Sequence, residues 1–203
     1  MTFDALIIGG GAAGMSCALV LGSAKNKPYA KDKTIGIIMH QKASHLQDAL
    51  FNNVLGLKPG TTGESILEEG QKQLSDLYPH VVQIENEKVL EVLQTGNYFT
   101  VITNKNSYRS EIVVIAAGYT NLFNIKGLEQ YVEDHPRDNK EKERIWLKNE
   151  NHLIKKGLYV AGTLAGWRSQ FAMASGSGAH VATDILTLWN HGVHTKVHDK
   201  LVR

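Results

Sequence analysis

A run of three glycines directly after a short apolar segment constrains the fold of this chain more than any other feature. Residues 5–8 are continuously apolar, which is typical of a parallel strand buried on both faces. The glycines begin at residue 9, and the Ala- and Leu-rich residues 12–21 that follow them favour a helix. A polar loop containing Pro28 then leads to a second apolar run at residues 35–39. The sequence therefore predicts a strand, a glycine turn, a helix and a second parallel strand.

The glycines of this unit follow the pattern Gly-x-Gly-x-x-Gly. We expect Gly9 to form the tight turn, Gly11 to let a diphosphate approach the backbone, and Gly14 to let the helix contact the strand. The backbone N–H groups at the start of the helix, at Ala12 and Ala13, would then face the phosphates. Glycine runs also form plain turns, but the position of this one between a buried strand and a helix predicts dinucleotide binding.

The end of the second strand is where an acidic residue normally binds the adenosine ribose of a dinucleotide. In this chain His40 occupies that position, and Gln41 follows it. Either side chain can hydrogen-bond a ribose, although more weakly than a carboxylate, whose charge-assisted hydrogen bonds are about twice as strong. The alternative is that His40 is a solvated residue at a strand end.

The rest of the chain predicts an α/β fold in which a parallel sheet is flanked by helices. Thr and Ser side chains at 61–65 can cap a helix whose apolar face runs over residues 66–78. A final helix over residues 171–189 begins with Ala, Ser and Gly, which let a backbone or a ligand come close. A small antiparallel meander is predicted from four short β-type segments, at residues 81–84, 89–93, 98–103 and 107–111. The chain is expected to return to the parallel sheet in two continuously apolar segments, at residues 112–116 and 158–161.

Length and composition favour one compact domain over residues 1–203. Its core would come from two segments, residues 1–120 and 156–190. Between them, residues 129–151 carry mostly charged and amide side chains. We therefore expect residues 129–151 to be a charged surface connection that buries little.

Charge and cysteine content exclude several classes of function. A net charge of only +2 gives no strong positive field for binding nucleic acid. The single cysteine, Cys17, excludes a disulfide or a CxxC pair within the chain, and we expect it to be a small buried hydrophobe. No segment approaches the roughly 20 apolar residues of a membrane-spanning helix, and the first residues do not resemble a signal peptide. We therefore expect a cytoplasmic protein with neither nucleic acid nor membrane as a partner.

Two groups of titratable side chains are candidates for chemistry, and we expect neither to act. His191, His194 and His198 follow a helical spacing, but a glycine interrupts them, so a polar tail is expected rather than a metal site. Asp134 and His135 lie in the charged connection, where the sequence implies no pocket for acid–base catalysis.

Four motifs occur in a particular order along the chain. They are Asp-Ala-Leu-Ile-Ile-Gly-Gly-Gly-Ala-Ala-Gly at 4–14, Asn-Val-Leu-Gly-Leu-Lys-Pro-Gly at 53–60, Val-Val-Ile-Ala-Ala-Gly at 113–118, and Leu-Tyr-Val-Ala-Gly at 158–162 followed by Arg-Ser-Gln-Phe at 168–171. Together they resemble the FAD-binding half of the thioredoxin reductase-like flavoproteins, within the superfamily that has two dinucleotide-binding domains. The resemblance covers most of the chain except residues 119–157. It implies a Rossmann-like FAD/NAD(P)-binding domain with FAD as the cofactor.

The resemblance also implies which strand ends would hold the cofactor. The Ala-Thr-Gly strand end of the family corresponds to residues 116–118, which include Ala117 and Gly118. The Gly-Asp pair that holds the ribityl chain and the pyrophosphate in the family corresponds to Gly162 and Thr163. Thr163 could still donate one hydroxyl hydrogen bond.

Further positions follow from the same resemblance. Ser169 lies in the turn that opens the last helix, where the backbone N–H groups of Gln170 and Phe171 would contact the pyrimidine end of the isoalloxazine. The positive end of that helix could stabilise the charge of a reduced flavin. Asn53 matches a position beside the flavin, and Val89 matches a position beside the adenine.

The chain departs from the family pattern in three respects. The family inserts an NADPH domain with a CxxC pair, whereas only about 40 residues span that gap here, against the ~100 or more of a separate domain. Where relatives carry cysteines, this chain has His-Pro-Arg-Asp at 135–138. The acids expected at positions 40 and 163 are replaced by His40 and Thr163. Disulfide reduction by the route usual in the family is therefore excluded.

The function indicated is that of a single-domain FAD-dependent oxidoreductase. It would transfer electrons between the flavin and an unidentified donor or acceptor, which could be a protein or a small molecule, and no side chain is expected to act as a catalytic acid, base or nucleophile. The alternative is a noncatalytic relative that binds a nucleotide or a partner protein. NAD binding without flavin is a third reading, to which the motifs at 158–162 and 168–171 are less well suited. Relatives form homodimers through the FAD domain, which implies a homodimer here.

Overall fold

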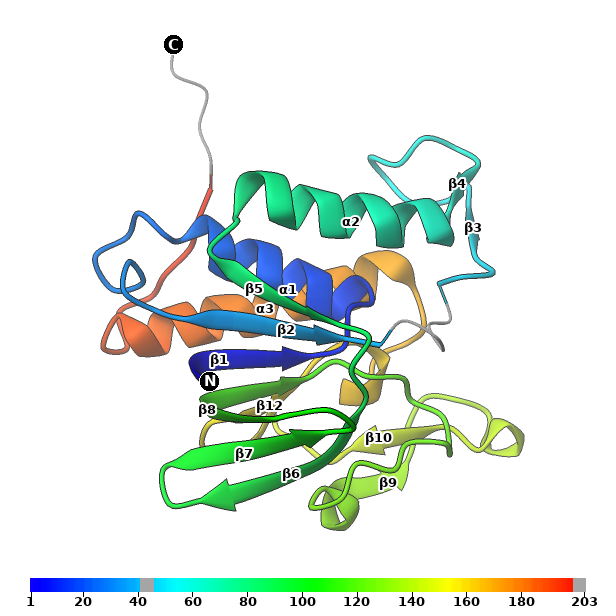
Figure 1. The fold of residues 1–203 in the computed structure, drawn as a ribbon. Helices are drawn as coiled ribbons and strands as arrows, with labels where there is room; N and C mark the ends of the chain where they lie inside the picture. Colours follow the sequence, from blue (N-terminus) through cyan, green and yellow to red (C-terminus); the bar gives the residue numbers. More distant parts are fainter. Residues whose placement is uncertain (41–45, 199–203) are drawn as a thin grey trace.

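A mixed β-sheet runs through the middle of the molecule, with helices on one face and a β-meander on the other (Figure 1). The computed structural model describes residues 1–40 and 46–198. The main sheet has the order β11-β12-β8-β1-β2-β5. All neighbours in this order pair in parallel except β11 and β12, which are antiparallel. The strands are β1 (Thr2–Ile8), β2 (Ile35–Met39), β5 (Val81–Glu85), β8 (Ser107–Ile115), β11 (Leu153–Lys155) and β12 (Leu158–Val160).

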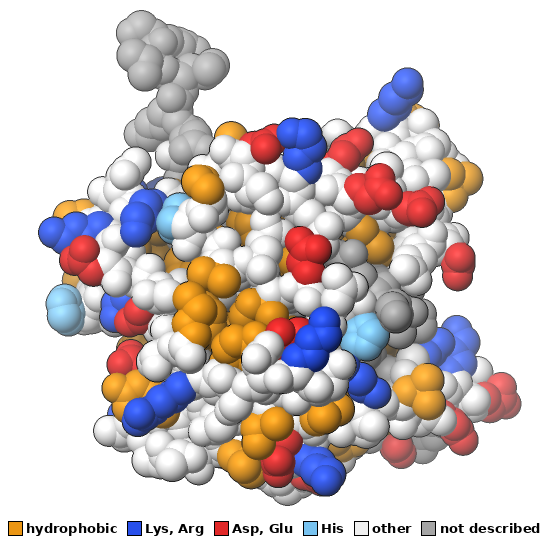
Figure 2. All heavy atoms as spheres, viewed as in Figure 1, with side chains coloured by type: hydrophobic (Ala, Val, Ile, Leu, Met, Phe, Trp, Pro, Cys, Tyr) orange, Lys and Arg blue, Asp and Glu red, His pale blue; other side chains and the backbone are white. Residues whose placement is uncertain are grey.

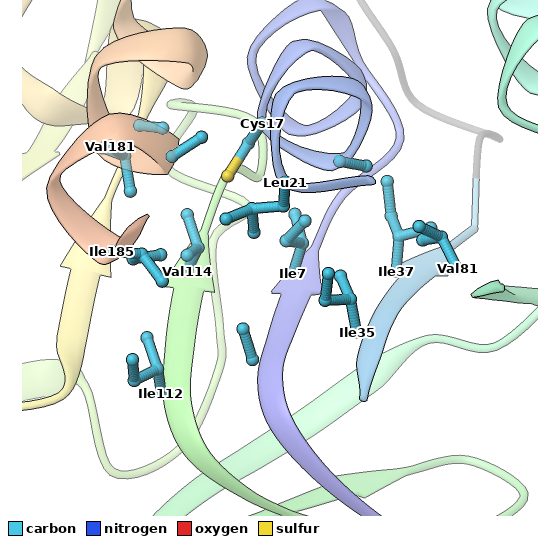
Figure 3. Close-up of a cluster of buried hydrophobic side chains, with 14 of the residues drawn as sticks. Ile7, Cys17, Leu21, Ile35, Ile37, Val81, Ile112, Val114, Val181 and Ile185 are labelled. Atoms are coloured by element: carbon cyan, nitrogen blue, oxygen red, sulfur yellow. The ribbon is translucent and has the colours of Figure 1, made fainter. Parts of the chain in front are cut away.

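Three helices cover one face of this sheet. Helix α1 (Ala12–Ser23) and helix α3 (Phe171–Trp189) lie side by side, and α2 (Gly63–Leu77) packs next to α1. Figure 3 shows the core between them, in which Cys17 and Leu21 of α1 point toward the apolar side chains of the parallel strands and of α3. Cys17 is fully buried, which confirms its expected role as a small hydrophobe. The expected strand, glycine turn, helix and second strand are all confirmed.

Helix α2 begins as its sequence predicts. The side-chain oxygen of Thr62 accepts a hydrogen bond from the backbone N–H of Ser65 at 3.2 Å, and Glu64 lies in the first turn. Both features stabilise a helix N-terminus, because they satisfy a free N–H group and complement the positive end of the helix dipole. A short hairpin of β3 (Leu50–Phe51) and β4 (Thr61–Thr62) precedes the helix.

The antiparallel meander on the other face is smaller than expected. It consists of β6 (Val89–Thr95), β7 (Tyr98–Thr103) and β8. The prediction that residues 81–84 belong to it is wrong, because β5 instead extends the parallel sheet beside β2, with Ile38 opposite Ile84. The predicted division between residues 107–111 and 112–116 is also wrong. β8 is one strand whose first half pairs with β7 and whose second half is buried between β1 and β12.

The charged segment at residues 129–151 does not behave as a solvated connection throughout. It contains two short 3₁₀ turns, η1 (Glu129–Tyr131) and η2 (Lys140–Lys142), and an antiparallel ribbon of β9 (Val132–Asp134) and β10 (Ile145–Leu147). Leu147 is fully buried, and His135 is only 7% exposed. The expectation that this segment buries little is therefore wrong for the ribbon, because its apolar side chains pack into the core on the meander side of the sheet.

The remaining features bear on partners. Figure 2 shows cationic and anionic side chains interspersed on the face seen there, which matches the small net charge and offers no extended positive surface. Within residues 1–40 and 46–198, no helix combines the length and the apolar character needed to span a membrane.

Candidate dinucleotide-binding site

The carboxyl ends of three parallel strands meet at one edge of the sheet. As the chain leaves β1, β8 and β12, hydrogen bonds still tie it to the neighbouring strand: Gly9 N–H donates to Ile38 O at 2.9 Å, Ala116 N–H to Ile8 O at 2.8 Å, and Ala161 N–H to Ile115 O at 2.9 Å. These contacts hold the loops that follow the strands close together. The crevice at the carboxyl ends of parallel strands is where open α/β sheets bind their ligands.

The glycine loop after β1 has the geometry that its sequence predicts. Gly9 has a φ of 117°, and a Cβ atom there would lie 2.3 Å from Ala116 O. A Cβ at Gly14 would lie 1.8 Å from Gly9 O, so only glycine lets α1 approach the loop this closely. The tight turn and the helix–strand contact are confirmed. The approach of a diphosphate to Gly11 stays a prediction.

Helices α1 and α3 start without the features that stabilise the start of α2. The N-cap residue is Gly11 at α1 and Gln170 at α3. Neither helix has a side-chain cap hydrogen bond, and neither first turn contains an acidic residue. The first hydrogen bonds within the helices come from Met15 N–H to Gly11 O and from Ala174 N–H to Gln170 O, both at 2.9 Å. The backbone N–H groups of the first turns therefore point out of the helices, where they can bind an anion.

The two helices and the turn after β12 come into contact around Ala13. This turn, η3 (Gly162–Ala165), begins at Gly162, whose φ is 81°. A Cβ at Gly162 would lie 3.0 Å from the Cβ of Ala13, and a Cβ at Gly178 of α3 would lie 1.9 Å from Ala13 O. The hydroxyl of Ser177 accepts a hydrogen bond from Gly162 N–H at 2.7 Å. Glycines thus let three backbones approach one another next to the glycine loop.

A cavity of about 200 Å³ lies beside the starts of α1 and α3. Its wall is mostly apolar and comes largely from α1 and α2, and Gly10 of the glycine loop and Phe171 and Ser175 of α3 also line it. The ring of Phe51 lies 5.1 Å from the ring of Phe171. The hydroxyl oxygen of Ser175 is buried and has no hydrogen-bond partner in the described part of the chain. An apolar cavity with an unsatisfied polar atom is suited to a flat ring that carries hydrogen-bonding groups.

The structure brings most of the predicted positions to this edge of the sheet. Ala117 and Gly118 lie in the loop just after β8, and Thr163 lies in η3 beside Gly162. Gly118 is exposed, and a Cβ there would meet no atom within 4 Å. Ser169 and Gln170 are exposed at the start of α3, where Phe171 is half-buried. The N–H of Gln170 donates to Arg168 O at 2.9 Å, which leaves Phe171 and the residues after it as the free donors of this turn.

Among the described residues, the other predicted positions do not lie at the ends of β1, β8 and β12. Asn53 is exposed in the loop between β3 and β4, and Val89 is buried in the core on the meander side of the sheet. His40 is half-buried directly after β2. Gln41 lies outside the described residues. His40 lines a small hollow together with Glu85 of β5, an acid that the sequence analysis did not single out.

Side chains from the charged segment hold η3 in place. His135 Nε2 donates to Thr163 O at 3.1 Å, because its other ring nitrogen accepts a hydrogen bond from Arg137 N–H at 3.2 Å. Arg137 Nη1 donates to Gly166 O at 2.6 Å, and Asn149 Nδ2 donates to Ala165 O at 3.2 Å. Both nitrogens of His135 are engaged, so it positions η3 rather than transferring protons. The sequence carries no signal for this role, because polar residues in a charged run resemble a solvated loop.

A second buried histidine contacts the strand that leads into this turn, β12. His152 is 3% exposed, and its Nδ1–H donates to Val160 O at 2.9 Å. Its ring stacks on Trp167 with 6.0 Å between the ring centres and an angle of 16° between the ring planes. Burial lowers the pKa of His152. Trp167, which follows η3, therefore packs on a protein ring.

The structure offers no metal site in the part that it describes. Helix α3 ends at Trp189, and His191 has a φ of 56°, so His191, His194 and His198 do not share a helical face. Within residues 1–40 and 46–198, no group of three His, Cys, Asp or Glu side chains could hold a metal ion.

Comparison with known proteins supports an assignment by family. The family model described as "Pyridine nucleotide-disulphide oxidoreductase" matches residues 3–167. A curated relative, the uncharacterized oxidoreductase CzcO of Bacillus velezensis, is 27% identical over 143 residues. That match covers 66% of this chain and 41% of the relative, so the chain spans about two fifths of that protein.

Solved structures share the fold at low sequence identity. A thioredoxin reductase from Gloeobacter violaceus has a TM-score of 0.75 and 14% identity, over 98% of this chain and 99% of that one. A ferredoxin-flavin thioredoxin reductase from Clostridium acetobutylicum has a TM-score of 0.68 and 19% identity, over 94% and 99%. An oxidoreductase from Agrobacterium tumefaciens has a TM-score of 0.74 and 14% identity, over 91% and 97%.

These matches confirm the expected Rossmann-like fold of the thioredoxin reductase-like flavoproteins. The family model is one of oxidoreductases, and the curated relative is named an oxidoreductase. The family model covers most of the chain. The chain belongs to the pyridine nucleotide-disulphide oxidoreductase family.

Proposed function

We propose that this chain binds FAD at the edge where β1, β8 and β12 end and acts as a single-domain flavin oxidoreductase with an external electron donor and acceptor. One observation carries the proposal. Residues at the starts of α1 and α3, the two helices without N-terminal side-chain caps, line the same largely apolar cavity, and so does Gly10 of the glycine loop. Free N–H groups beside an apolar wall suit a dinucleotide, which has a charged diphosphate at one place and an uncharged ring at another.

The residues present fit FAD in most respects. Gly9 and Gly14 let the glycine loop and α1 pack closely on neighbouring backbone. No side chain caps α1, so a diphosphate can reach the first-turn N–H groups of Ala12 and Ala13. Gly162 lets η3 approach Ala13 of α1 closely, at the turn that would hold the ribityl chain. Thr163 can donate one hydroxyl hydrogen bond in place of the acid that relatives carry.

Each part of the site has a separate task. When bound, the flavin supplies the electron or hydride transfer. The N–H groups from Phe171 onward, at the positive end of α3, hydrogen-bond the ring and stabilise negative charge that develops there. The apolar wall of the cavity excludes water from the ring. His135, Arg137 and Asn149 hold η3, and therefore Gly162, in position.

The electron donor is external because this chain holds no second nucleotide-binding unit between β8 and β11. The sequence between residues 119 and 157 has glycines only at 127 and 157, so it contains no second Gly-x-Gly-x-x-Gly motif. The ribbon of β9 and β10 fills that part of the chain and packs against the core. The donor could be a protein or a small molecule, and a homodimer is proposed from the resemblance to the family.

A noncatalytic relative that binds a nucleotide or a partner protein is the second candidate. The absence of a carboxylate at His40 and at Thr163 favours it, because each acid would add charge-assisted hydrogen bonds to the cofactor.

Visible absorption of the purified chain separates the two candidates. We expect a flavin spectrum, and we expect denaturation to release FAD rather than FMN. A colourless protein that does not bind added FAD would support the noncatalytic candidate. Under anaerobic conditions NADPH should bleach the flavin slowly or not at all, and rapid bleaching by NADPH alone would contradict the external donor. Light scattering would test the homodimer.

A further inference from the structure

A small hollow lies at the carboxyl ends of β2 and β5, where the adenosine ribose of a dinucleotide would lie. It measures about 80 Å³ and is lined by Met39, His40, Gln71, Glu85 and Asn86. It adjoins the glycine loop, since a Cβ at Gly10 would lie 2.7 Å from Cγ of Met39. A ligand that binds its diphosphate at the glycine loop therefore has this hollow next to it, at the place where dinucleotide-binding folds hold the ribose.

The pairing of β2 with β5 directs the side chain of Glu85 into the hollow. In a parallel pair, residues opposite each other place their side chains on the same face of the sheet. Met39 is opposite Glu85, and Ile37 is opposite Gln83. Met39 and Ile37 belong to the core on the helix side, so Glu85 also points to that side, at the last position before the edge.

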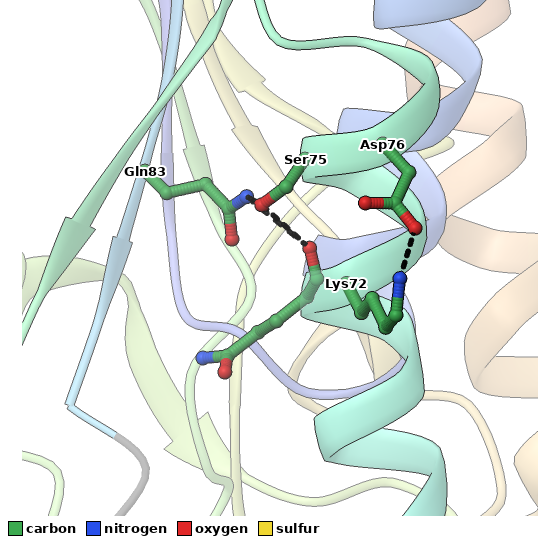
Figure 4. A network of polar contacts seen from close by, with 5 residues as sticks. Lys72, Ser75, Asp76 and Gln83 are labelled. Carbon is green, nitrogen blue, oxygen red and sulfur yellow. Dashed lines mark hydrogen bonds and ion pairs between the residues drawn. The ribbon is translucent and has the colours of Figure 1, made fainter.

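Helix α2 forms the wall opposite Glu85, and Gln83 anchors it. Gln83 Nε2 donates to Ser75 Oγ at 2.7 Å and to Gln71 O at 3.3 Å (Figure 4). Gln71 in turn lies within 3.5 Å of the sulfur of Met39. The helix side of the hollow is therefore held in place before any ligand arrives, and preorganisation of this kind lowers the cost of binding.

The carboxylate of Glu85 has no cation to neutralise it in the described part of the chain. None of the ion pairs there includes Glu85. The lysine of α2 seen in Figure 4, Lys72, is instead paired with Asp76. Glu85 is exposed, so its charge is solvated and available to a ligand. A carboxylate accepts hydrogen bonds from two adjacent hydroxyl groups, which is the arrangement that a ribose presents.

We propose that Glu85 supplies, from the neighbouring strand β5, the carboxylate that His40 no longer provides at the end of β2, and that it binds the ribose hydroxyls of the adenosine half of the cofactor. The inference rests on the proposed binding of a dinucleotide at this edge and names its ribose-binding and specificity-determining residue. A carboxylate at this position also repels a phosphate on the ribose 2′-oxygen. The hollow should therefore select an unphosphorylated adenosine ribose.

Binding measurements on the flavin-free chain test this directly. The probes are FAD, ADP-ribose and 2′-phospho-ADP-ribose, measured by calorimetry on the wild type, on Glu85→Gln and on the matched control Glu111→Gln, which removes the same charge from an exposed position of β8. We expect Glu85→Gln to weaken ADP-ribose and FAD binding about tenfold, with no change in Glu111→Gln. We also expect Glu85→Arg to reverse the preference between the two ADP-ribose probes.

The outcomes separate this inference from the proposed function. Unchanged affinities in Glu85→Gln, in a protein that binds FAD, would overturn the role of Glu85 and leave the proposed function standing. A wild type that binds ADP-ribose but not FAD would overturn the proposed function, whereas a loss of ADP-ribose binding in Glu85→Gln would still support the ribose contact. A wild type that binds none of the probes would overturn both. Circular dichroism of each variant would check that the fold is intact.

Discussion

Replacing Gly178 with alanine should force helices α1 and α3 apart. The added Cβ would lie 1.9 Å from Ala13 O, whereas ordinary contacts begin at 3.4 Å, so the helices would have to separate by the difference of roughly 1.5 Å. The obstacle is backbone in the middle of a helix contact, which no side-chain rotation can relieve. Overpacking of this kind costs about 3 kcal/mol, more than the ~1 kcal/mol that alanine gains over glycine in a helix.

The same helix offers a matched control in Gly176. This glycine is exposed, and a Cβ there would meet no atom within 4 Å, so Gly176→Ala should stabilise the protein by up to about 1 kcal/mol. Urea denaturation and thermal unfolding would measure both variants. The net cost of Gly178→Ala is then about 2 kcal/mol, and at about 2–4 °C per kcal/mol for a chain of this size it should lower Tm by about 4–8 °C, while Gly176→Ala should leave Tm unchanged or raise it.

The contact also connects stability to the site, because Ala13 lies between Gly178 and Gly162. Gly178→Ala should therefore also lower the fraction of protein that retains its cofactor. If Gly178→Ala and Gly176→Ala unfolded at the same urea concentration, the close approach of α1 to α3 would be refuted. The account of how Gly162 reaches Ala13 would be refuted with it.

Three further predictions concern buried side chains. His135→Ala removes a hydrogen bond to Thr163 O and should lower the free energy of unfolding, measured by urea titration, by about 1–2 kcal/mol. The control Lys148→Ala breaks an exposed ion pair with Glu133 and should cost less than about 1 kcal/mol. Equal losses in the two variants would contradict the role of His135. Burial lowers the pKa of His152, so as the pH falls through about 6.5 the unfolded chain binds more protons than the folded chain does. The free energy of unfolding contributed by neutral His152 is present above that pH and should decline below it. If the urea midpoint of His152→Gln declined equally with pH, another group would cause the effect. Cys17 is fully buried, and burial raises the pKa of its thiol. An aromatic disulfide reagent should therefore label Cys17 only after the protein unfolds. Rapid labelling of the native protein would contradict the burial of Cys17.

Local signals in the sequence account for the part of the fold that was predicted correctly. The apolar run before Gly9, the spacing to Gly14 and the cap at Thr62 each act within a few residues, and the structure places β1, α1 and α2 accordingly. Helix α3 also begins and ends where its pattern predicts. In these segments neighbouring residues decide the conformation, so no knowledge of distant partners is needed.

Pairing between distant segments explains what the sequence did not reveal. Residues 81–84 have the composition of a meander strand, and only their register with β2 makes β5 a parallel edge. A charged run resembles a solvated segment, although His135 and Arg137 reach a carbonyl of η3 and that of Gly166 just after it, which lie 28 and 29 residues away in the chain. Glu85 ends an ordinary strand, and only the adjacent end of β2 places it beside His40.

The sequence by itself determined that a parallel α/β fold opens with a glycine loop between a buried strand and a helix, because turn geometry and helix propensity are properties of adjacent residues. The tertiary structure decided which backbones meet at Ala13, which polar side chains hold η3, and that the carboxylate of Glu85 lies beside His40. Those contacts depend on strand order and register, which the whole core sets together and which no short stretch of sequence encodes.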